Sequence, residues 1–230
     1  MAATVDAAAS YQSAGVDVTS ASWTHVCASN ATLLLVSISS DNDTGVPTVA
    51  VTYNGVSMTA IPSGTAQTGT TTTDRSIFTF YLVNPAVGSH SVAFTLTGTT
   101  SGTGVVGGSV SFLGSDTTTP LGTAVNNQGS ASTASVTTTG STANDLVFST
   151  VSSASTSAPT AGTGITSQFN LVSGTNLYGV GGTQTGGASV VSTWTTGAVK
   201  HAMVGVAVRA APQHPYGSLN PAVMVRSHFF

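Results

Sequence analysis

The sequence carries very little charge. It has no glutamate, Lys200 is its only lysine, and charged residues make up 5% of its 230 positions. Three scattered arginines form no basic cluster, so the chain lacks the main electrostatic source of affinity for phosphates, and we predict no nucleic-acid partner. A surface with so few charges also has little self-repulsion, which favours association with copies of itself or with another protein.

Three further features are missing. Cys27 is the only cysteine, so the chain forms no internal disulfide, and we expect a buried, inert thiol because a reactive one needs basic neighbours. Residues 1–6 contain neither the basic nor the apolar run of a secretory signal, and no stretch approaches the roughly 20 apolar residues of a membrane helix. We therefore expect a protein that is made in the cytoplasm without a signal peptide and has no membrane partner.

What the chain does contain favours β-sheet. Serine and threonine supply roughly a third of the residues, beside 26 glycines, and apolar residues reach 40%. That apolar share can form a core, and a net charge of −3 is lower than disordered chains usually carry. Threonine is β-branched and suits the exposed face of a pleated sheet, whereas most residues that favour long helices are scarce. We predict an all-β protein.

Alternation of apolar and polar residues with period two is the dominant pattern. The strongest hairpin joins strands at 48–53 and 56–61 through Asn54-Gly55, because both turn residues tolerate the positive φ of a type I′ turn. No segment of ten residues shows helical periodicity, and many short strands at regular spacing indicate a sandwich or barrel. Further strands are predicted at 32–39, 76–83, 90–97, 105–113, 145–152, 188–195 and 201–209.

A faint internal duplication divides the chain into two related halves. Residues 91–96 (SVAFTL) run through a glycine-rich turn into 108–112 (GSVSF), and residues 189–194 (SVVSTW) run into 205–209 (GVAVR). The matched blocks lie about a hundred residues apart, too far for a solenoid. They indicate pseudo-repeats at about 16–115 and 131–211, which form either one sandwich or two packed sandwiches. We prefer one, since residues 116–135 offer no linker beyond a loop.

The predicted organisation has three parts: an N-terminal segment at 1–14, a β-sandwich domain at 15–211 and a C-terminal arm at 212–230. Three prolines exclude regular helix from the arm and disfavour sheet. The arm nevertheless ends in apolar and aromatic residues, which indicates an extended segment that docks on a partner, with folding back onto its own domain as the alternative. The residues predicted to bind the partner are Pro212, Pro215, Tyr216, Leu219, Pro221, Val223, Met224, Val225, Phe229 and Phe230.

No motif predicts catalysis, a metal or a cofactor. The five histidines show no spacing typical of metal ligands. Residues 41–45 (DNDTG) partly match an oxygen-rich calcium loop but lack its later glutamate, so a polar loop is favoured and a calcium site is the alternative. No nucleophile motif or phosphate-binding loop occurs, and nothing supports the paired carboxylates of a glycoside hydrolase. We predict a non-enzymatic protein, with hydrolase activity as a remote alternative.

Six aromatic residues are candidates for a sugar-stacking platform. In sandwiches such residues more often belong to the core or to an edge, and we favour that interpretation. The six are Trp23, Trp194, Tyr11, Tyr53, Tyr81 and Tyr178.

Five segments resemble a known class of domain. They are 23–26 (WTHV), 33–38 (LLLVSI), 51–59 (VTYNGVSMT), 81–88 (YLVNPAVG) and 204–208 (VGVAV). Together they resemble jelly-roll-like β-sandwich domains of tailed-bacteriophage virion proteins, which are related to bacterial surface sandwich domains. The resemblance covers about residues 15–210 and implies an antiparallel jelly-roll-like sandwich. It brings no catalytic residues.

The resemblance also implies a role. Bacterial surface relatives usually carry an export signal and further modules, whereas a free-standing, unsignalled sandwich with an apolar arm is more similar to capsid decoration (cement) proteins. We therefore expect a virion structural protein on the capsid surface that binds the major capsid protein or another virion protein. We also expect a homo-oligomer, a trimer or a dimer. The alternative is a receptor-binding tail protein or a carbohydrate-binding adhesin module, carried by threonine-rich faces and exposed aromatic residues.

Overall fold

The computed structural model describes residues 1–41, 45–69, 74–98 and 104–213, and it confirms the predicted all-β class. These residues form strands and no helix, and every strand pairing is antiparallel. The strands are β1 (Thr4–Gln12), β2 (Ser20–Cys27), β3 (Ala31–Asp41), β4 (Thr48–Tyr53), β5 (Val56–Ser57), β6 (Thr59–Gln67), β7 (Arg75–Val83), β8 (Gly88–Thr97), β9 (Val105–Leu113), β10 (Val125–Gly129), β11 (Thr133–Thr139), β12 (Leu146–Ser153), β13 (Thr160–Ala161), β14 (Thr166–Ser173), β15 (Leu177–Thr185), β16 (Ser189–Thr195) and β17 (His201–Val208).

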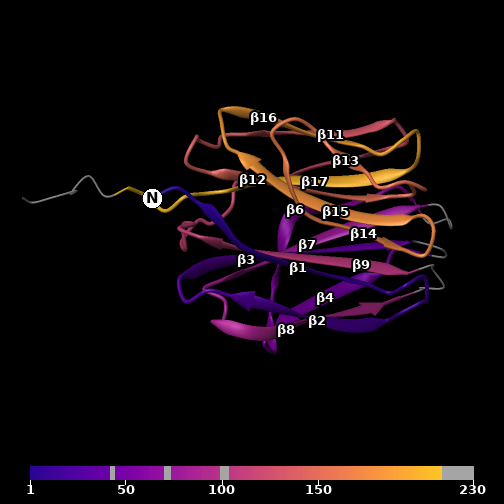
Figure 1. The fold of residues 1–230 in the computed structure, drawn as a ribbon, viewed down its shortest axis with the longest axis horizontal. Coiled ribbons are helices and arrows are strands. Elements are labelled where there is room, and N and C mark those ends of the chain that lie inside the picture. Colours follow the sequence, from indigo (N-terminus) through magenta and orange to yellow (C-terminus); the bar gives the residue numbers. More distant parts are fainter. Residues whose placement is uncertain (42–44, 70–73, 99–103, 214–230) are drawn as a thin grey trace, which may run out of the picture.

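The strands build four sheets that are stacked face to face (Figure 1). From top to bottom in Figure 1 these are the upper outer sheet (β11-β16-β13), the upper inner sheet (β10-β17-β12-β15-β14), the lower inner sheet (β1-β9-β3-β7-β6) and the lower outer sheet (β2-β8-β4-β5). Residues before position 114 form the two lower sheets, and residues after position 124 form the two upper ones. The arrangement therefore has four layers, whereas the single sandwich that we preferred would have two.

The strand order is the same in the two halves. With the two-residue β5 set aside, β1 corresponds to β10, β2 to β11 and so on, and both the inner and the outer sheets then have matching orders. The sequence blocks 91–96 and 189–194 fall on the corresponding strands β8 and β16. Strands β1 and β10 lie before the predicted repeat boundaries at 16 and 131, and each forms the edge of an inner sheet. The N-terminal segment at 1–14 is thus largely a strand, paired with β9.

Burial follows from the layer in which a strand lies. The outer strands alternate between exposed and buried residues, as β2 and β11 show, because one face of an outer sheet meets solvent. The inner strands are covered on both faces, so they contain nearly continuous buried runs, as in β3 and β17. On β3, Leu33 and Leu35 face the core between the two inner sheets, whereas Leu34 and Val36 face the core between the lower sheets.

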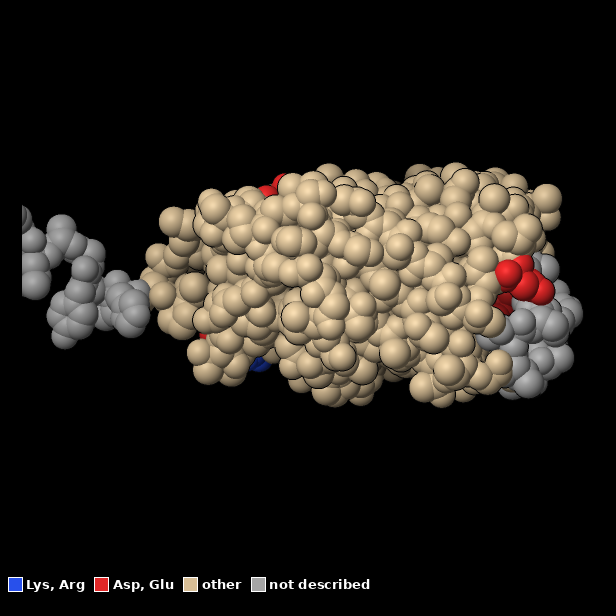
Figure 2. All heavy atoms as spheres, turned by 90° about the horizontal axis from the view of Figure 1, so that it is seen from below, with Lys and Arg blue, Asp and Glu red and all other residues tan. Residues whose placement is uncertain are grey.

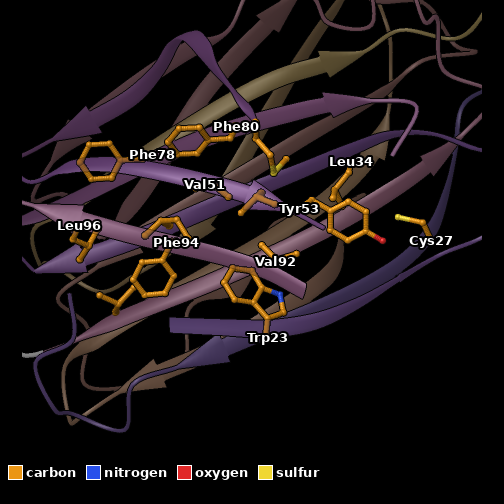
Figure 3. Close-up of a cluster of buried hydrophobic side chains, with 14 of the residues drawn as sticks. Trp23, Cys27, Leu34, Val51, Tyr53, Phe78, Phe80, Val92, Phe94 and Leu96 are labelled. Carbon is orange, nitrogen blue, oxygen red and sulfur yellow. The ribbon is translucent and has the colours of Figure 1, made fainter. Parts of the chain in front are cut away.

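Aromatic side chains fill the three interlayer cores. Trp23, Tyr53 and Phe94 lie between the two lower sheets (Figure 3), and Trp194 on β16 lies between the two upper sheets. Phe169 belongs to the core between the inner sheets, which joins the two halves. The core residues come from both ends of the sequence, so neither inner sheet can bury both of its faces without the other half.

Candidate functional site

The root of the predicted C-terminal arm is tied to one end of the molecule. After β17, the backbone of Arg209 donates to the carbonyl of Pro120 at 2.9 Å and accepts from the amide of Asp116 at 2.8 Å. Two residues on, the amide of Ala211 donates to the carbonyl of Gly114 at 2.8 Å. The chain entering the arm is therefore paired with the connection between the two halves as far as Ala211.

A carboxylate holds the same root from the other side. The Oδ1 atom of Asp145 accepts a hydrogen bond of 2.7 Å from the amide of Ala210, and its Oδ2 accepts one of 2.7 Å from the amide of Thr142. Asp145 is buried, so its carboxylate is held in place as the acceptor for both amides. This single side chain joins the start of β12 to the end of β17.

The loop that begins at Asp116 is shaped by its own aspartate. The carboxylate of Asp116 accepts hydrogen bonds from the amides of Thr118 and Thr119 at 2.7 and 3.1 Å and from the Thr119 hydroxyl at 2.9 Å. These bonds, with a smaller contribution from the positive charge of Arg209, lower the pKa of Asp116. The loop is therefore a turn held by its own hydrogen bonds. The negative charge of Asp116 is attracted to the positive charge of Arg209 at the arm root.

Three shallow hollows surround this loop at the end of the molecule. One of about 440 Å³ has apolar walls that include Ile61, Tyr81 and Leu121. A second of about 610 Å³ lies between Thr32 and Pro212, and a third of about 340 Å³ includes Asp145 and Gln213 among its lining residues. Residues of the arm root line all three, so the described chain ends among surfaces that could hold extended peptide.

The predicted partner-binding residues fall mostly beyond what the structure describes. Pro212 is exposed and lines two of the hollows. The other nine lie outside the described residues, so their role stays a prediction. They are Pro215, Tyr216, Leu219, Pro221, Val223, Met224, Val225, Phe229 and Phe230.

Charged residues gather at the opposite end of the molecule. Arg75 Nη1 contacts Asp41 Oδ1 at 2.6 Å, and Lys200 Nζ contacts Asp74 Oδ1 at 2.7 Å. Arg75 also donates from Nη2 to the carbonyl of Asn176 at 3.1 Å, so the cluster ties β7 to the second half of the chain. Burial lowers the pKa of Arg75, and the carboxylates of Asp41 and Asp74 oppose that shift.

This cluster bears on the calcium alternative for residues 41–45. Asp41 is engaged by a guanidinium at its Oδ1, and residues 42–44 lie outside the described residues. Within the described ranges, no group of three potential metal-ligating side chains converges. In the described part of the loop Asp41 forms an ion pair with Arg75, and the calcium alternative stays a prediction.

A buried chain of polar side chains connects the two lower sheets. His25 lies between Ser109 Oγ, 2.9 Å from its Nδ1, and Ser111 Oγ, 3.0 Å from its Nε2. Trp23 Nε1 donates to Ser109 Oγ at 2.9 Å, and Ser111 donates to Asp6 Oδ2 at 2.7 Å. With a neutral imidazole protonated on Nε2, His25 donates to Ser111 Oγ, and Ser111 donates to Asp6. The Ser109 hydroxyl shares its one proton between His25 Nδ1 and the carbonyl of Ala9, which is 3.2 Å away.

These residue types also occur in hydrolases, but their surroundings here are those of a core. His25, Ser109 and Ser111 are each at most 1% exposed, and none of the three lines a described hollow. Burial lowers the pKa of His25 to about 4, with the charge of Asp6 opposing the shift, so the imidazole is neutral at pH 7. The arrangement satisfies buried polar groups, and sequence reasoning missed it because its members come from β1, β2 and β9.

Cys27 and three of the six aromatic candidates are buried. Cys27 is buried, as predicted, and burial raises the pKa of its thiol. The tryptophans and Tyr53 are buried in the cores, with Trp23 stacked on Tyr11 at a centroid distance of 6.1 Å. They cannot form an exposed sugar platform, which confirms the core interpretation for these three.

The long sides of the molecule carry almost no charge. None of the strands in the two outer sheets contains aspartate, glutamate, lysine or arginine. Figure 2 views the molecule from below, and the face is almost uniformly uncharged between its two ends. Charge is concentrated at the end with Asp41 and Arg75 and at the arm end with Asp116 and Arg209.

Comparison of the chain with protein-family models, curated proteins and solved structures finds no match. Roles for individual residues therefore rest on the geometry of this chain. No helix in the described part of the chain is long and apolar enough to cross a membrane.

Proposed function

We propose that this chain is a non-catalytic virion structural protein of a tailed bacteriophage, a capsid decoration protein on the capsid surface. In this role the C-terminal arm, residues 212–230, binds the major capsid protein or another virion protein. The protein is made in the host cytoplasm and acts as a homo-oligomer. The observation that carries the proposal is the position of the arm root at one end of an elongated body whose long sides carry almost no charge.

The firm attachment of the arm root supports a bridging role. Residues 209–211 are hydrogen-bonded to the connection between the halves and to Asp145, so an arm bound to a shell would also orient the body. Strand β3 runs for eleven residues between the arm end and the charged end, roughly 35 Å at 3.3 Å per residue. The body would then project from the shell along its strands, with its uncharged sides toward neighbouring copies.

Binding of this kind would stabilise the shell because binding and shell assembly are thermodynamically linked. A protein that binds only the assembled shell shifts assembly toward that state by mass action, without any chemistry of its own. The shallow hollows at the arm end suit extended peptide better than an enclosed small-molecule ligand, because each is open to solvent. The carbohydrate-binding alternative depended on exposed aromatic residues, and the burial of Trp23, Tyr53 and Trp194 leaves it with less support.

The test compares incorporation into particles of the virus that encodes the chain. The full chain is compared with a chain ending at Gln213, which keeps the anchored root, and with full-length Phe229→Ser/Phe230→Ser as a control of matched length. We expect mass spectrometry of purified particles to find the full chain and to lose both variants, while circular dichroism shows both still folded. Incorporation of the chain ending at Gln213 at the native level would overturn the arm's role, and absence of the full chain from particles would overturn the virion proposal.

A further inference from the structure

Within the described residues, most of the eight edges of the four sheets are protected from pairing with another chain. An exposed strand edge is a template for a further strand, and proteins usually block it with short strands, bulges, prolines or charges. Here β5 and β13 have two residues each and β10 has five. Strand β1 has a register shift at Asp6, β6 has one around Pro62, and β14 has one between Ser167 and Phe169.

Two edges lack all of these devices. Strands β2 and β11 are eight and seven residues long, pair without register shifts and contain neither proline nor a formal charge. Each pairs on one side only among the described residues, β2 with β8 and β11 with β16. They occupy corresponding positions in the lower and upper outer sheets.

The direction of the backbone groups on β11 follows from the bonds at its two ends. The amide of Thr196 donates to the carbonyl of Ser132, and the amide of Gly140 donates to that of Ala188. In the register of β11 and β16, even-numbered residues of β11 are therefore the hydrogen-bonded ones. The amides and carbonyls of the odd-numbered residues point away from β16, toward the open edge. These residues are Thr133, Ser135, Thr137 and Thr139.

The outward residues of β11 are complementary to themselves. An antiparallel copy related by a twofold axis at Val136 places residue 133 opposite 139 and residue 135 opposite 137. Both of these pairs consist of outward-directed residues, which is the parity that an antiparallel ladder requires for its hydrogen-bonded pairs, and the even-numbered residues between them form the non-hydrogen-bonded pairs. The side chains that meet are threonine with threonine and serine with threonine, which are favourable cross-strand pairs.

We propose that two copies of this chain associate through β11, so that their upper outer sheets join into one continuous sheet. Strand β11 is favoured over β2 because most of its residues are β-branched, whereas in β2 only Thr24 and Val26 are. No charge on β11, β13 or β16 opposes the approach. The exposed, uncharged side chains of Asn127 and Gln128 on the neighbouring β10 form a polar rim.

The proposal deepens the proposed function by naming the contact between copies, and it does not use the arm. Its test is the mass in solution, by light scattering and sedimentation over a range of concentrations. Ser135→Lys/Thr137→Lys places like charges opposite each other across the twofold axis. Ser135→Lys/Thr137→Glu places opposite charges there. The matched control is Ser22→Lys/Thr24→Lys, which puts the same change at outward positions on β2.

The native chain, the β2 control and the lysine–glutamate variant are expected to be dimers. The double-lysine variant on β11 is expected to raise the dimer dissociation constant at least about tenfold, because two like-charged pairs face each other. A monomeric native chain, or equal dissociation constants for the two β11 variants, overturns the proposal. The proposal is also overturned if the β2 control dissociates while the double-lysine variant on β11 stays dimeric. The chain ending at Gln213 should stay dimeric even if it no longer binds particles, and a monomer there assigns the contact to the arm.

Discussion

The contact between the two halves of the chain can be tested at the aromatic ring of Phe169. Phe169 on β14 lies against Gly181, its cross-strand neighbour on β15, and reaches across to Gly108 on β9 of the other inner sheet. A Cβ atom added at position 108 would stand 2.2 Å from Cζ of Phe169, and one at position 181 would stand 2.4 Å from the same atom. Real Cβ contacts are not this short, since carbon atoms meet favourably at about 3.5–4.0 Å. Gly108→Ala therefore forces the ring or the sheets to move.

The expected cost follows from two opposing effects. Overpacking of a filled core costs about 1–3 kcal/mol, while alanine lowers the entropy of the unfolded chain and returns about 0.4–1 kcal/mol. The φ angle of Gly108 is not positive, so the substitution adds no backbone strain. We expect Gly108→Ala to lower the free energy of unfolding by about 1–2 kcal/mol. Gly129→Ala is the control, because its Cβ would meet no atom closer than 3.7 Å.

Urea unfolding followed by circular dichroism and tryptophan fluorescence measures both changes. The Gly129→Ala chain should equal or slightly exceed the native stability. Adding Phe169→Leu to Gly108→Ala should recover part of the loss, since the shorter side chain vacates the space that the new methyl group needs. If Gly108→Ala is as stable as Gly129→Ala, or if Phe169→Leu brings no recovery, the two halves do not meet through this ring.

Two further predictions concern buried hydrogen bonds. Burial holds the pKa of His25 at about 4 in the folded chain, against 6.5 in the unfolded chain. Between these pH values the unfolded chain binds a proton that the folded chain does not, so unfolding takes up a proton. The free energy of unfolding therefore falls as the pH drops from about 6.5 to about 4, by up to about 3 kcal/mol. Urea unfolding of His25→Gln across that range should show a shallower loss than the native chain, and an equal loss would contradict the assignment. Asp145→Ala removes the acceptor for the amides of Ala210 and Thr142, which should cost about 1–3 kcal/mol and speed hydrogen exchange at Ala210. Asp145→Asn keeps an acceptor oxygen and should retain more protection, and unchanged exchange in the alanine variant would show that Asp145 does not hold the arm root.

Local patterns predicted most of the strands that lie in the sheet interiors. The hairpin at Asn54-Gly55 joins β4 to β5, and both turn residues have the positive φ that the dipeptide indicated, 49° and 76°. Strands β3, β7, β8, β9, β12, β16 and β17 lie close to their predicted ranges. These segments are rich in β-branched and apolar residues, so their local preference and their burial agree.

The strands that were missed are mostly edges, or are rich in glycine. Strand β1 consists largely of alanine and polar residues and is only half-buried, so its alternation is weak. Strand β15 contains glycines where the ring of Phe169 and the side chain of Val106 come close, and glycine weakens any local strand signal. Their positions are decided by neighbours that are distant in sequence.

The composition of the sequence and its alternation with period two were enough by themselves to determine that this protein is antiparallel β-sheet with an apolar, proline-interrupted C-terminus. Both properties depend on residues next to one another. Only the tertiary structure decided that there are four layers, because the continuous apolar run of β3 calls for cover on both faces but does not say which segments supply it. It also decided that Asp6, His25 and Ser111 meet, and that the arm root lies beside Asp145. Such contacts join residues far apart in the chain, and a local pattern carries no information about which distant segment will cover it.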